Sequence, residues 1–349
     1  MTMLDMLVLV LLAAFLWGAK LRRDTDGDYL SAETCLSWRG VFAVIILLHH
    51  TVESTGGGLL FSRFEWLGYL SAGIFFFFSG FGVMTQYRRS SRYAEGFLRR
   101  RLPTVLLPYL VMAAVYALMF AVTGRGKTVG EILRALSHGE TFVPNAWFIL
   151  VILLQYVAFR LLTLLCGQRY GRIVVLSGVL YLLWAALCRA LGFGDWWYIS
   201  AHLFTLGLLW ALYEEKLRSF FAKHRLAWLV GTFLLFLVFH RGAWRVQPYL
   251  PYEWMATLIT LLTACFFTLS IVLLSMTLRF GNGLTRFLGK CSMEIYLSHA
   301  AFMLILRSRF ISLQNDLLWV TGVLVCTAVF SCVLRRLLEP LLARIKRKT

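Results

Sequence analysis

An arginine and a histidine lie eleven positions apart in one apolar stretch of this chain. Arg39 stands near the start of the stretch and His50 near its end. Eleven residues of α-helix make almost three whole turns, so both side chains share one face, roughly 16.5 Å apart along the axis. A guanidinium fits phosphate oxygens, and an imidazole near its free pKa of about 6.5 can take a proton from a hydroxyl. The spacing therefore predicts a site that holds an anionic group at one end and activates a hydroxyl at the other.

Two further polar residues flank His50. Glu53 follows by three positions and stays near the same face, so we expect its carboxylate to orient the imidazole. His49 is turned about 100° away, so we expect the two histidines not to act as a pair. In a membrane helix a charged side chain costs roughly 2.5–3.5 kcal/mol, which favours a functional role for the in-phase pair. The alternative is that Arg39 reaches the interface while His50 bonds a nearby carbonyl.

The composition is that of an integral membrane protein. Of 349 residues, 60% are hydrophobic and only 15% are charged, whereas about a quarter of a soluble protein is charged. The net charge of +18 would suit a nucleic-acid partner, but the basic residues lie between apolar segments, where topology explains them. We therefore expect a lipid bilayer and no nucleic acid. The seven cysteines include no CxxC pair, which predicts packing roles and no metal site.

Apolar segments recur along the whole chain. They predict an all-α, polytopic membrane bundle of about eleven transmembrane helices, the first of them retained and not a cleaved signal. Two segments, 199–213 and 227–240, are short for a span of roughly 20 residues. The eleven segments are 4–20, 35–52, 66–86, 102–122, 146–165, 173–191, 199–213, 227–240, 253–278, 291–306 and 317–334.

Loop charges predict the orientation of these helices. With the N-terminus outside, 25 Lys and Arg residues fall on cytoplasmic segments and 9 on outer ones, as the positive-inside bias requires. We expect a multi-pass protein of the cytoplasmic (inner) membrane, with its N-terminus outside and its C-terminus in the cytoplasm. The 88–101 loop then faces the cytoplasm, and Thr123–Asn145 faces outward with a short helix around Val129–Ser137.

Four motifs follow one another in a characteristic order. They are the R-x10-H pattern of Arg39 and His50, the Ser-Gly-Phe-Gly run ending at Gly82, the basic run at 99–101 followed by Leu-Pro, and the Gly-Lys-x-Ser-x-x-Ile-Tyr-Leu-x-His run ending at His299. Together they resemble the acyltransferase-3 family of integral membrane acyltransferases. The resemblance implies ten family helices at 30–335, an extra N-terminal helix and cytoplasmic loop at 1–29, and a basic cytoplasmic tail at 336–349.

This resemblance implies an enzyme that moves an acyl group, commonly acetyl, from cytoplasmic acyl-CoA to a hydroxyl of a cell-surface or lipid-linked glycan. Acyl-CoA, most simply acetyl-CoA, would be a co-substrate, and we expect no permanently bound cofactor. His50, Arg39 and Glu53 are the catalytic candidates, and a His-linked acyl intermediate and direct transfer both stay open. Because coenzyme A carries several phosphates, arginines are the donor-binding candidates: Arg39, Arg89, Arg92, Arg99, Arg100 and Arg101.

One position departs from the family pattern, and five more residues are candidates for the acceptor side. Thr104 stands where the family often has another arginine, so Arg89 with Arg92, or the run at 99–101, is expected to substitute.

Ser292 and His299 are seven apart and therefore in phase on one late helix. Substrate-binding candidates are Asn145, Trp147, Ser292, Tyr296 and His299. An interfacial anchor for Trp147 and a bonded core histidine for His299 are the alternatives. Glu294, inside the membrane, is expected to pair with Lys290 or Ser298.

Two other functions fit parts of the pattern. A transporter or flippase of a lipid-linked glycan would line its path with Arg39, Glu53 and Glu294, but the inverted repeats of many transporters are not visible in the sequence. A b-haem protein would draw its ligands from His50, His202, His240 and His299, but the sequence has no His-x-x-x-His pair. Oligomeric state is left open by the sequence.

Overall fold

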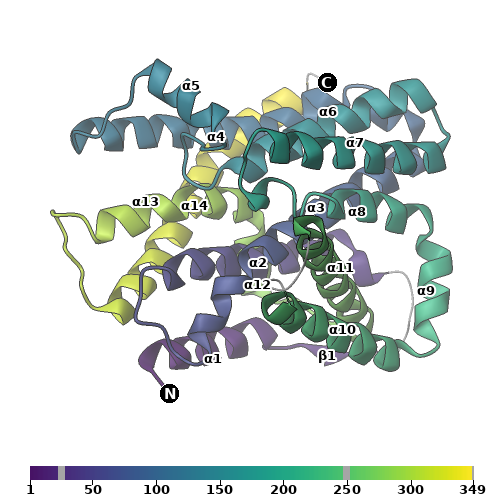
Figure 1. Ribbon diagram of the computed structural model, residues 1–349, viewed down its shortest axis with the longest axis horizontal. Helices are drawn as coiled ribbons and strands as arrows, with labels where there is room; N and C mark the ends of the chain where they lie inside the picture. Colours follow the sequence, from purple (N-terminus) through teal and green to yellow (C-terminus); the bar gives the residue numbers. More distant parts are fainter. Residues whose placement is uncertain (23–27, 247–251, 348–349) are drawn as a thin grey trace.

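A computed structural model describes residues 1–22, 28–246 and 252–347 (Figure 1). Within these ranges the chain forms fourteen α-helices, four short 3-10 turns and a single pair of two-residue strands. The predicted all-α membrane bundle is confirmed. Two residues of the charge count, Arg23 and Lys348, lie outside the described residues.

Eight of the described helices are long and apolar enough to cross a membrane. They are α2 (Ala32–Val52), α3 (Gly68–Arg89), α4 (Phe97–Val122), α6 (Trp147–Cys166), α7 (Tyr170–Ala190), α10 (Arg225–Val246), α11 (Glu253–Thr277) and α14 (Asp316–Arg347). Three shorter apolar helices fall on the expected spans 4–20, 199–213 and 291–306: α1 (Met3–Leu16), α8 (Leu203–Leu212) and α13 (Ser292–Leu306). The total of eleven spans stays a prediction.

The remaining elements connect these helices. They are α5 (Val129–Ser137), α9 (Glu214–Ala222), α12 (Gly283–Lys290) and the 3-10 turns η1 (Asp28–Leu30), η2 (Phe61–Trp66), η3 (Ser91–Ala94) and η4 (Asp195–Trp197). The short helix expected in the outer loop is confirmed as α5. Thr128 caps its first turn, because its hydroxyl accepts from the Glu131 amide and the Glu131 carboxylate accepts from the Thr128 amide.

Two helices are longer than their apolar segments. The stretch expected at 227–240 is part of the 22-residue helix α10. The last expected span, 317–334, continues as α14 to Arg347. Leu338 and Leu342 in this extension are each 4% exposed and lie one turn apart, so apolar residues at helical spacing carry the helix into the predicted basic tail.

Glycine pairs allow two helix pairs to cross at close range. A Cβ on Gly80 of α3 would lie 2.0 Å from the carbonyl oxygen of Phe204 in α8. A Cβ on Gly207 of α8 would lie 2.2 Å from the carbonyl oxygen of Phe77 in α3. Helix α2 crosses α12 in the same way at Gly40 and Gly289. Small residues at such crossings let membrane helices pack backbone to backbone, and here they fix the position of α2.

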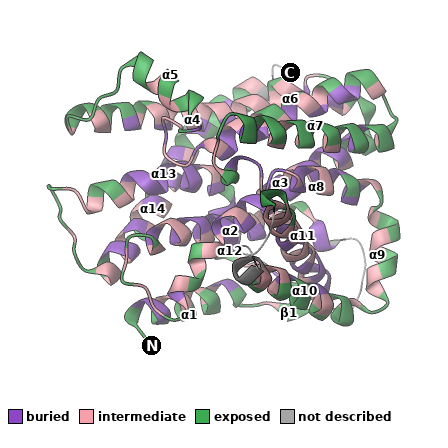
Figure 2. Ribbon diagram, viewed as in Figure 1, coloured by how far each residue is buried: buried purple, intermediate pink, exposed green. Residues whose placement is uncertain are grey.

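Helix α2 is the centre of the bundle. Figure 2 shows buried residues concentrated along α2, α3, α8 and α13, and exposed ones along α5, α7 and α9. Ala43 and Ile46, on the stripe between Arg39 and His50, are 0% and 4% exposed. On another face the Trp38 indole donates to Ser275 of α11 over 2.7 Å. The helix that carries the catalytic candidates is therefore held from several sides.

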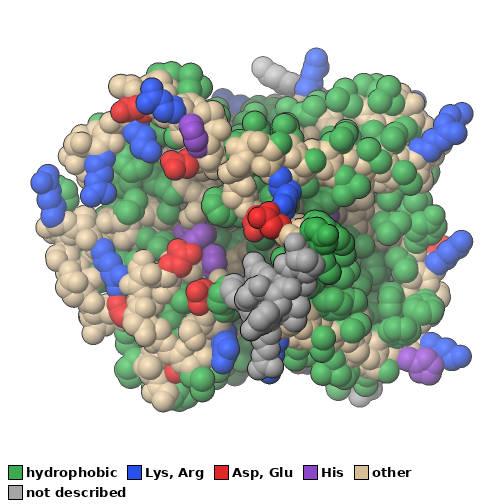
Figure 3. All heavy atoms as spheres, viewed as in Figure 1, with side chains coloured by type: hydrophobic (Ala, Val, Ile, Leu, Met, Phe, Trp, Pro, Cys, Tyr) green, Lys and Arg blue, Asp and Glu red, His purple; other side chains and the backbone are tan. Residues whose placement is uncertain are grey.

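Contacts between loops divide the molecule into two ends. At one end β1 (Lys20–Leu21) pairs antiparallel with β2 (Leu278–Arg279), and Arg286 pairs with Glu33 over 2.6 Å. At the other end Asp5 accepts from the amides of Leu60 and Phe61. Each of these contacts joins segments that the loop charges place on the same side. Lys and Arg side chains stand out at the left and right edges in Figure 3, near α5 and α9, with hydrophobic side chains covering much of the face between them.

Candidate active site

His50 meets His299 near the end of α2. The two imidazole rings stack with centroids 5.1 Å apart and planes inclined by 15°. His299 is fully buried on α13, and its Nδ1 donates to the Tyr296 carbonyl over 2.7 Å. Its Nε2 is therefore an acceptor, and this buried atom has no hydrogen-bond partner in the described structure. A residue predicted for the acceptor side thus covers one face of the predicted base.

His49 lies closer to His50 than the helical phase predicts. Their ring centroids are 4.6 Å apart, because the side chains of these adjacent residues in the last turn of α2 bend toward each other. The His49 ring packs against Gly68 of α3, where a Cβ would lie 2.4 Å from Nε2. Its Nδ1 donates to the Phe64 carbonyl over 3.1 Å. Helical phase alone therefore does not set the distance between the two rings, and the expectation that the two histidines do not act as a pair stays a prediction.

Glu53 stands opposite His49. Its carboxylate is 4.0 Å from His49 Nε2, the distance of an i,i+4 pair at the end of a helix. A carboxylate oxygen also lies within 4.8 Å of a ring nitrogen of His50, but no hydrogen bond joins the two in the described structure. The ion-pair contact of Glu53 is thus with His49, and the orienting role expected of Glu53 toward His50 stays a prediction.

A small cavity lies beside Arg39 and Ile46, on the face of α2 that carries His50 one turn further on. Its volume is about 20 Å³, close to the space that one water molecule occupies. The predicted acceptor residues Ser292 and Tyr296 line it together with Arg39. Helices α2, α3, α6 and α13 supply the complete lining: Arg39, Ile46, Ala72, Phe75, Phe148, Ser292, Met293 and Tyr296. The predicted face of α2 therefore turns toward these three helices.

At the Arg39 end of the cavity, charged side chains from four helices converge. Arg39 interacts electrostatically with Arg101 of α4 and Arg335 of α14, and also with Glu294 of α13. Glu294 is fully buried, and its carboxylate lies 3.6 Å from the Arg335 guanidinium. Within the described residues, Glu294 therefore pairs with Arg335 and with neither expected partner, Lys290 or Ser298. The Ser298 hydroxyl bonds that of Ser331.

Arg335 is the residue that sequence reasoning missed at this site. It was counted only as one of the basic residues that set the topology. A signal was present, because Ser331 is a polar residue in the apolar segment 317–334 and Arg335 follows it by four positions, which places both on one helix face. In the structure that face meets α13 at Ser298 and Glu294.

Only some of the arginines of the basic loop, residues 88–101, lie toward Arg39. Arg101 donates to the Tyr93 hydroxyl over 2.9 Å, and Arg100 donates to the Tyr93 carbonyl over 2.5 Å. The other three candidates of the loop, Arg89, Arg92 and Arg99, are exposed. The hydroxyl of Thr104, which stands in place of the family arginine, donates to the Arg101 carbonyl within α4. Arg101 is thus a loop candidate whose charge interacts with that of Arg39.

The acceptor-side candidates gather around α13. The Tyr296 hydroxyl donates to the carbonyl of Asn145, a residue with φ of 61° just before α6. The ring of Phe148, in the first turn of α6, meets that of Tyr296 with centroids 5.6 Å apart. Trp147 packs beside Phe76 of α3. The start of α6 is therefore joined to the helix that carries Ser292, Tyr296 and His299.

The four histidines considered as haem ligands do not converge. His202 contacts Cys265, and His240 stacks on Phe236. His50 and His299 do meet, but their rings are stacked face to face. Axial haem ligands point at one iron from opposite sides, so a stacked pair does not provide them.

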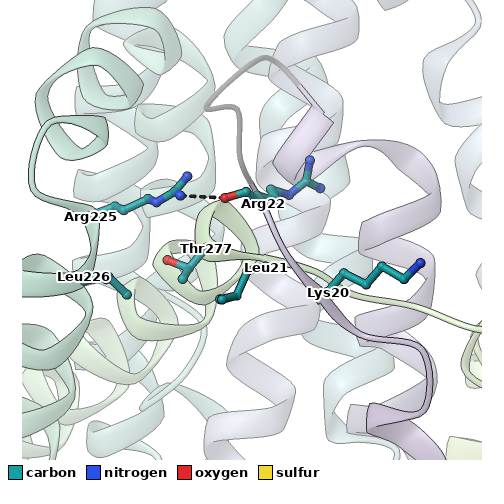
Figure 4. Close-up of a pocket in the computed structure, with 6 residues that line it drawn as sticks. All are labelled: Lys20, Leu21, Arg22, Arg225, Leu226 and Thr277. Atoms are coloured by element: carbon teal, nitrogen blue, oxygen red, sulfur yellow. Dashed lines mark hydrogen bonds between the residues drawn. The ribbon is translucent and has the colours of Figure 1, made fainter.

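A larger cavity lies away from the histidines. It measures about 790 Å³ and is shown in Figure 4, where Arg225 donates to the Arg22 carbonyl over 2.6 Å. Its lining consists of Lys20, Leu21, Arg22, Arg225, Leu226 and Thr277. These residues include no histidine or carboxylate that would serve as a general base at neutral pH. Size alone therefore does not identify the reactive site.

Comparison with known proteins adds one match. A family model described as an acyltransferase domain matches residues 37–336. The matched region includes Arg39, His50, Glu294, His299 and Arg335. No curated protein and no solved structure matches the chain.

Proposed function

The chain belongs to the acyltransferase domain family, and from this membership we propose that it moves an acyl group, most simply acetyl, from acyl-CoA to a hydroxyl of a cell-surface or lipid-linked glycan. The family and the spanning-length helices make the protein a multi-pass membrane acyltransferase. The thioester donor, the glycan acceptor and the O-acyl product are the parts we propose.

The convergence of arginines at one end of the cavity carries the donor proposal. Arg39, Arg101 and Arg335 interact with one another through Arg39, and Glu294 is the acidic group that interacts with this set in the described structure. Like charges gathered in a poorly solvated place repel, and a polyanion relieves that repulsion. The phosphates of coenzyme A are such a polyanion, and guanidinium forks suit them.

The distance along α2 supports the placement of the reaction. With phosphates near Arg39, an extended pantetheine arm that follows the cavity wall reaches the level of His50, roughly 16.5 Å away along the axis. Ile46, one turn before His50, lines that wall. The narrow cavity implies that helices or side chains move apart when the donor enters.

The chemistry proposed at His50 is a simple acyl transfer. The imidazole accepts the proton of the acceptor hydroxyl as its oxygen attacks the thioester carbonyl. The carbon–sulfur bond then breaks, and the coenzyme A thiolate takes a proton from the imidazolium. An ester and free coenzyme A result, and His50 returns to its neutral form. His299, held by the Tyr296 carbonyl, keeps one face of the His50 ring in place.

The same proposal sets the orientation in the cytoplasmic membrane. We place the N-terminus outside and the C-terminus in the cytoplasm, where acyl-CoA is made available. Loop contacts support this arrangement, because β1 with β2 and Arg286 with Glu33 each join two segments assigned to the cytoplasm. The contacts of Asp5 with Leu60 and Phe61 join two assigned to the outside.

A transfer assay tests the proposed function. Purified full-length protein in nanodiscs is incubated with acetyl-CoA labelled in the acetyl group and with glycans extracted from membranes of the expressing cells. We expect label in the glycan fraction that mild alkali releases as acetate, because O-acyl esters are alkali-labile and amides are not. A protein that binds coenzyme A yet transfers no label, or transfers it to an alkali-stable position, would overturn the proposal.

A further inference from the structure

The last turn of α2 gathers three side chains that can ligate a metal. His49, His50 and Glu53 each offer one ligand atom, and these atoms lie within 4.8 Å of one another. The cluster is accessible, since the side chain of Glu53 is 58% exposed and that of His49 is 19% exposed. The sequence alone predicted no metal site.

His49 is already held in the form that a metal requires. Because its Nδ1–H donates to the Phe64 carbonyl, Nε2 carries the free lone pair. That nitrogen points toward Glu53, whose carboxylate is 4.0 Å away. A carbonyl bonded to the far nitrogen is the outer-shell contact that metal-bound histidines usually make. Gly68 supports this ring position, because its missing side chain leaves room for the imidazole.

We propose that His49, His50 and Glu53 form a binding site for a divalent transition metal, with Zn²⁺ the best match. Two imidazoles and one carboxylate suit Zn²⁺, whereas Mg²⁺ and Ca²⁺ prefer oxygen ligands. Bond lengths of roughly 2.0–2.2 Å bring tetrahedral ligands to within about 3.4 Å of one another. Rotation of the exposed Glu53 side chain and small shifts of the imidazoles supply this contraction. The fourth position stays open to solvent.

Metal binding has a consequence that rests on the proposed function. A metal ion on His50 occupies the lone pair with which that imidazole accepts a proton. Bound zinc would therefore inhibit acyl transfer reversibly. His299, stacked on the other side of the His50 ring, limits the ring to small movements, so the same histidine cannot serve the metal and the acceptor together.

Cobalt is a direct probe of the site, because Co²⁺ with nitrogen and oxygen ligands absorbs visible light and takes the place of Zn²⁺. Purified full-length protein in detergent is titrated with Co²⁺ and, in parallel, with Zn²⁺ by calorimetry. We expect one equivalent to bind. His49→Asn is the decisive variant, because its amide can still donate to the Phe64 carbonyl but lacks Nε2. It should weaken zinc binding by at least ~10–100-fold, the loss that even an outer-shell change causes.

His138→Ala is the matched control, since His138 is exposed on the loop side of α5 and lies outside the cluster. It should bind zinc like the wild type. Absence of a cobalt spectrum, or zinc affinity unchanged in His49→Asn, would overturn the metal site.

Inhibition is measured separately in the transfer assay. Zinc should block the wild type, a chelator should restore it, and His49→Asn should transfer acyl groups while resisting zinc. Zinc that binds through His49 but leaves wild-type transfer intact would overturn His50 as a ligand. The cobalt spectrum does not depend on transfer, so a wrong function and a wrong metal site give different results.

Discussion

The imidazole of His50 on α2 stacks on that of His299 on α13, with ring centroids 5.1 Å apart. This contact joins the first and the last of the four sequence motifs. His299 cannot swing away without breaking its bond to the Tyr296 carbonyl. The predicted base is therefore backed by a fixed ring, which restricts the directions from which an acceptor hydroxyl approaches it.

Replacement of His50 should separate chemistry from binding. His50→Ala is expected to lower the transfer rate by ~10²–10⁴-fold, because a general base contributes about that much. Coenzyme A affinity, measured by calorimetry, should stay near the wild-type value, since the phosphates are expected at the other end of α2. His49→Ala is the control and should fall far less. Equal losses in the two variants would mean that the dipeptide has a structural role.

Arg101 and Arg99 should differ in donor binding although they are two residues apart. Arg101 interacts with Arg39, whereas Arg99 is exposed. A hydrogen bond to a charged group contributes about 1.5–3 kcal/mol, so Arg101→Gln should raise the KM for acetyl-CoA about tenfold or more. Its kcat should change less, as loss of uniform binding predicts. Arg99→Gln is the matched control and should leave this KM near the wild-type value. If Arg101→Gln also kept the wild-type KM, the loop would serve topology alone.

Glu294 and Arg335 should be coupled in stability. Arg335→Gln leaves the fully buried Glu294 without its ion-pair partner, a change that costs about 3–5 kcal/mol at buried pairs. We expect a clear fall in Tm, measured by thermal unfolding in detergent. The double variant Glu294→Gln with Arg335→Gln should recover part of the lost Tm. Arg336→Gln is the control, because Arg336 is exposed, and it should change the Tm little. Additive effects of the two single changes would contradict a direct pair.

Cysteine labelling should place the basic loop inside the cell. In a cysteine-free background, Ser90→Cys should react with a membrane-impermeant maleimide only after the membrane is opened. Lys127→Cys, in the loop before α5, should react in intact cells. Both positions are exposed in the structure, so accessibility to the reagent reports the side of the membrane. Labelling of Ser90→Cys from outside would reverse the orientation and remove the donor argument.

The crossing of α2 and α12 should not tolerate a single methyl group. A Cβ on Gly289 would lie 2.0 Å from the Leu36 carbonyl oxygen, and backbone atoms cannot turn aside as a side chain does. Gly289→Ala should therefore lower both Tm and transfer. Gly231→Ala in α10 is the matched control, because a Cβ there meets nothing within 4 Å. It should leave Tm unchanged or raise it, since Ala is favoured over Gly in helices by roughly 0.5–1 kcal/mol.

Local sequence periodicity was sufficient for much of the architecture. The apolar segments predicted the helical bundle, and the capping pattern at Thr128 agrees with the short helix α5. The spacing of Arg39, Ile46 and His50 predicted one shared face, and Arg39 and Ile46 do line one cavity. These features depend on 3.6 residues per turn and on hydrogen bonds within one segment, so neighbouring residues determine them.

Tertiary structure decided which of these faces meet. No local rule pairs Glu294 with Arg335, or stacks His299 on His50, because each contact depends on how α13 packs against α14 and α2. Side-chain direction at a helix end also lies beyond periodicity, which is why Glu53 faces His49 and not His50. The sequence by itself thus determined the helices and the helix face on which each residue lies. The close crossings at glycines such as Gly40 and Gly289 set the distances between helices, and with them the site.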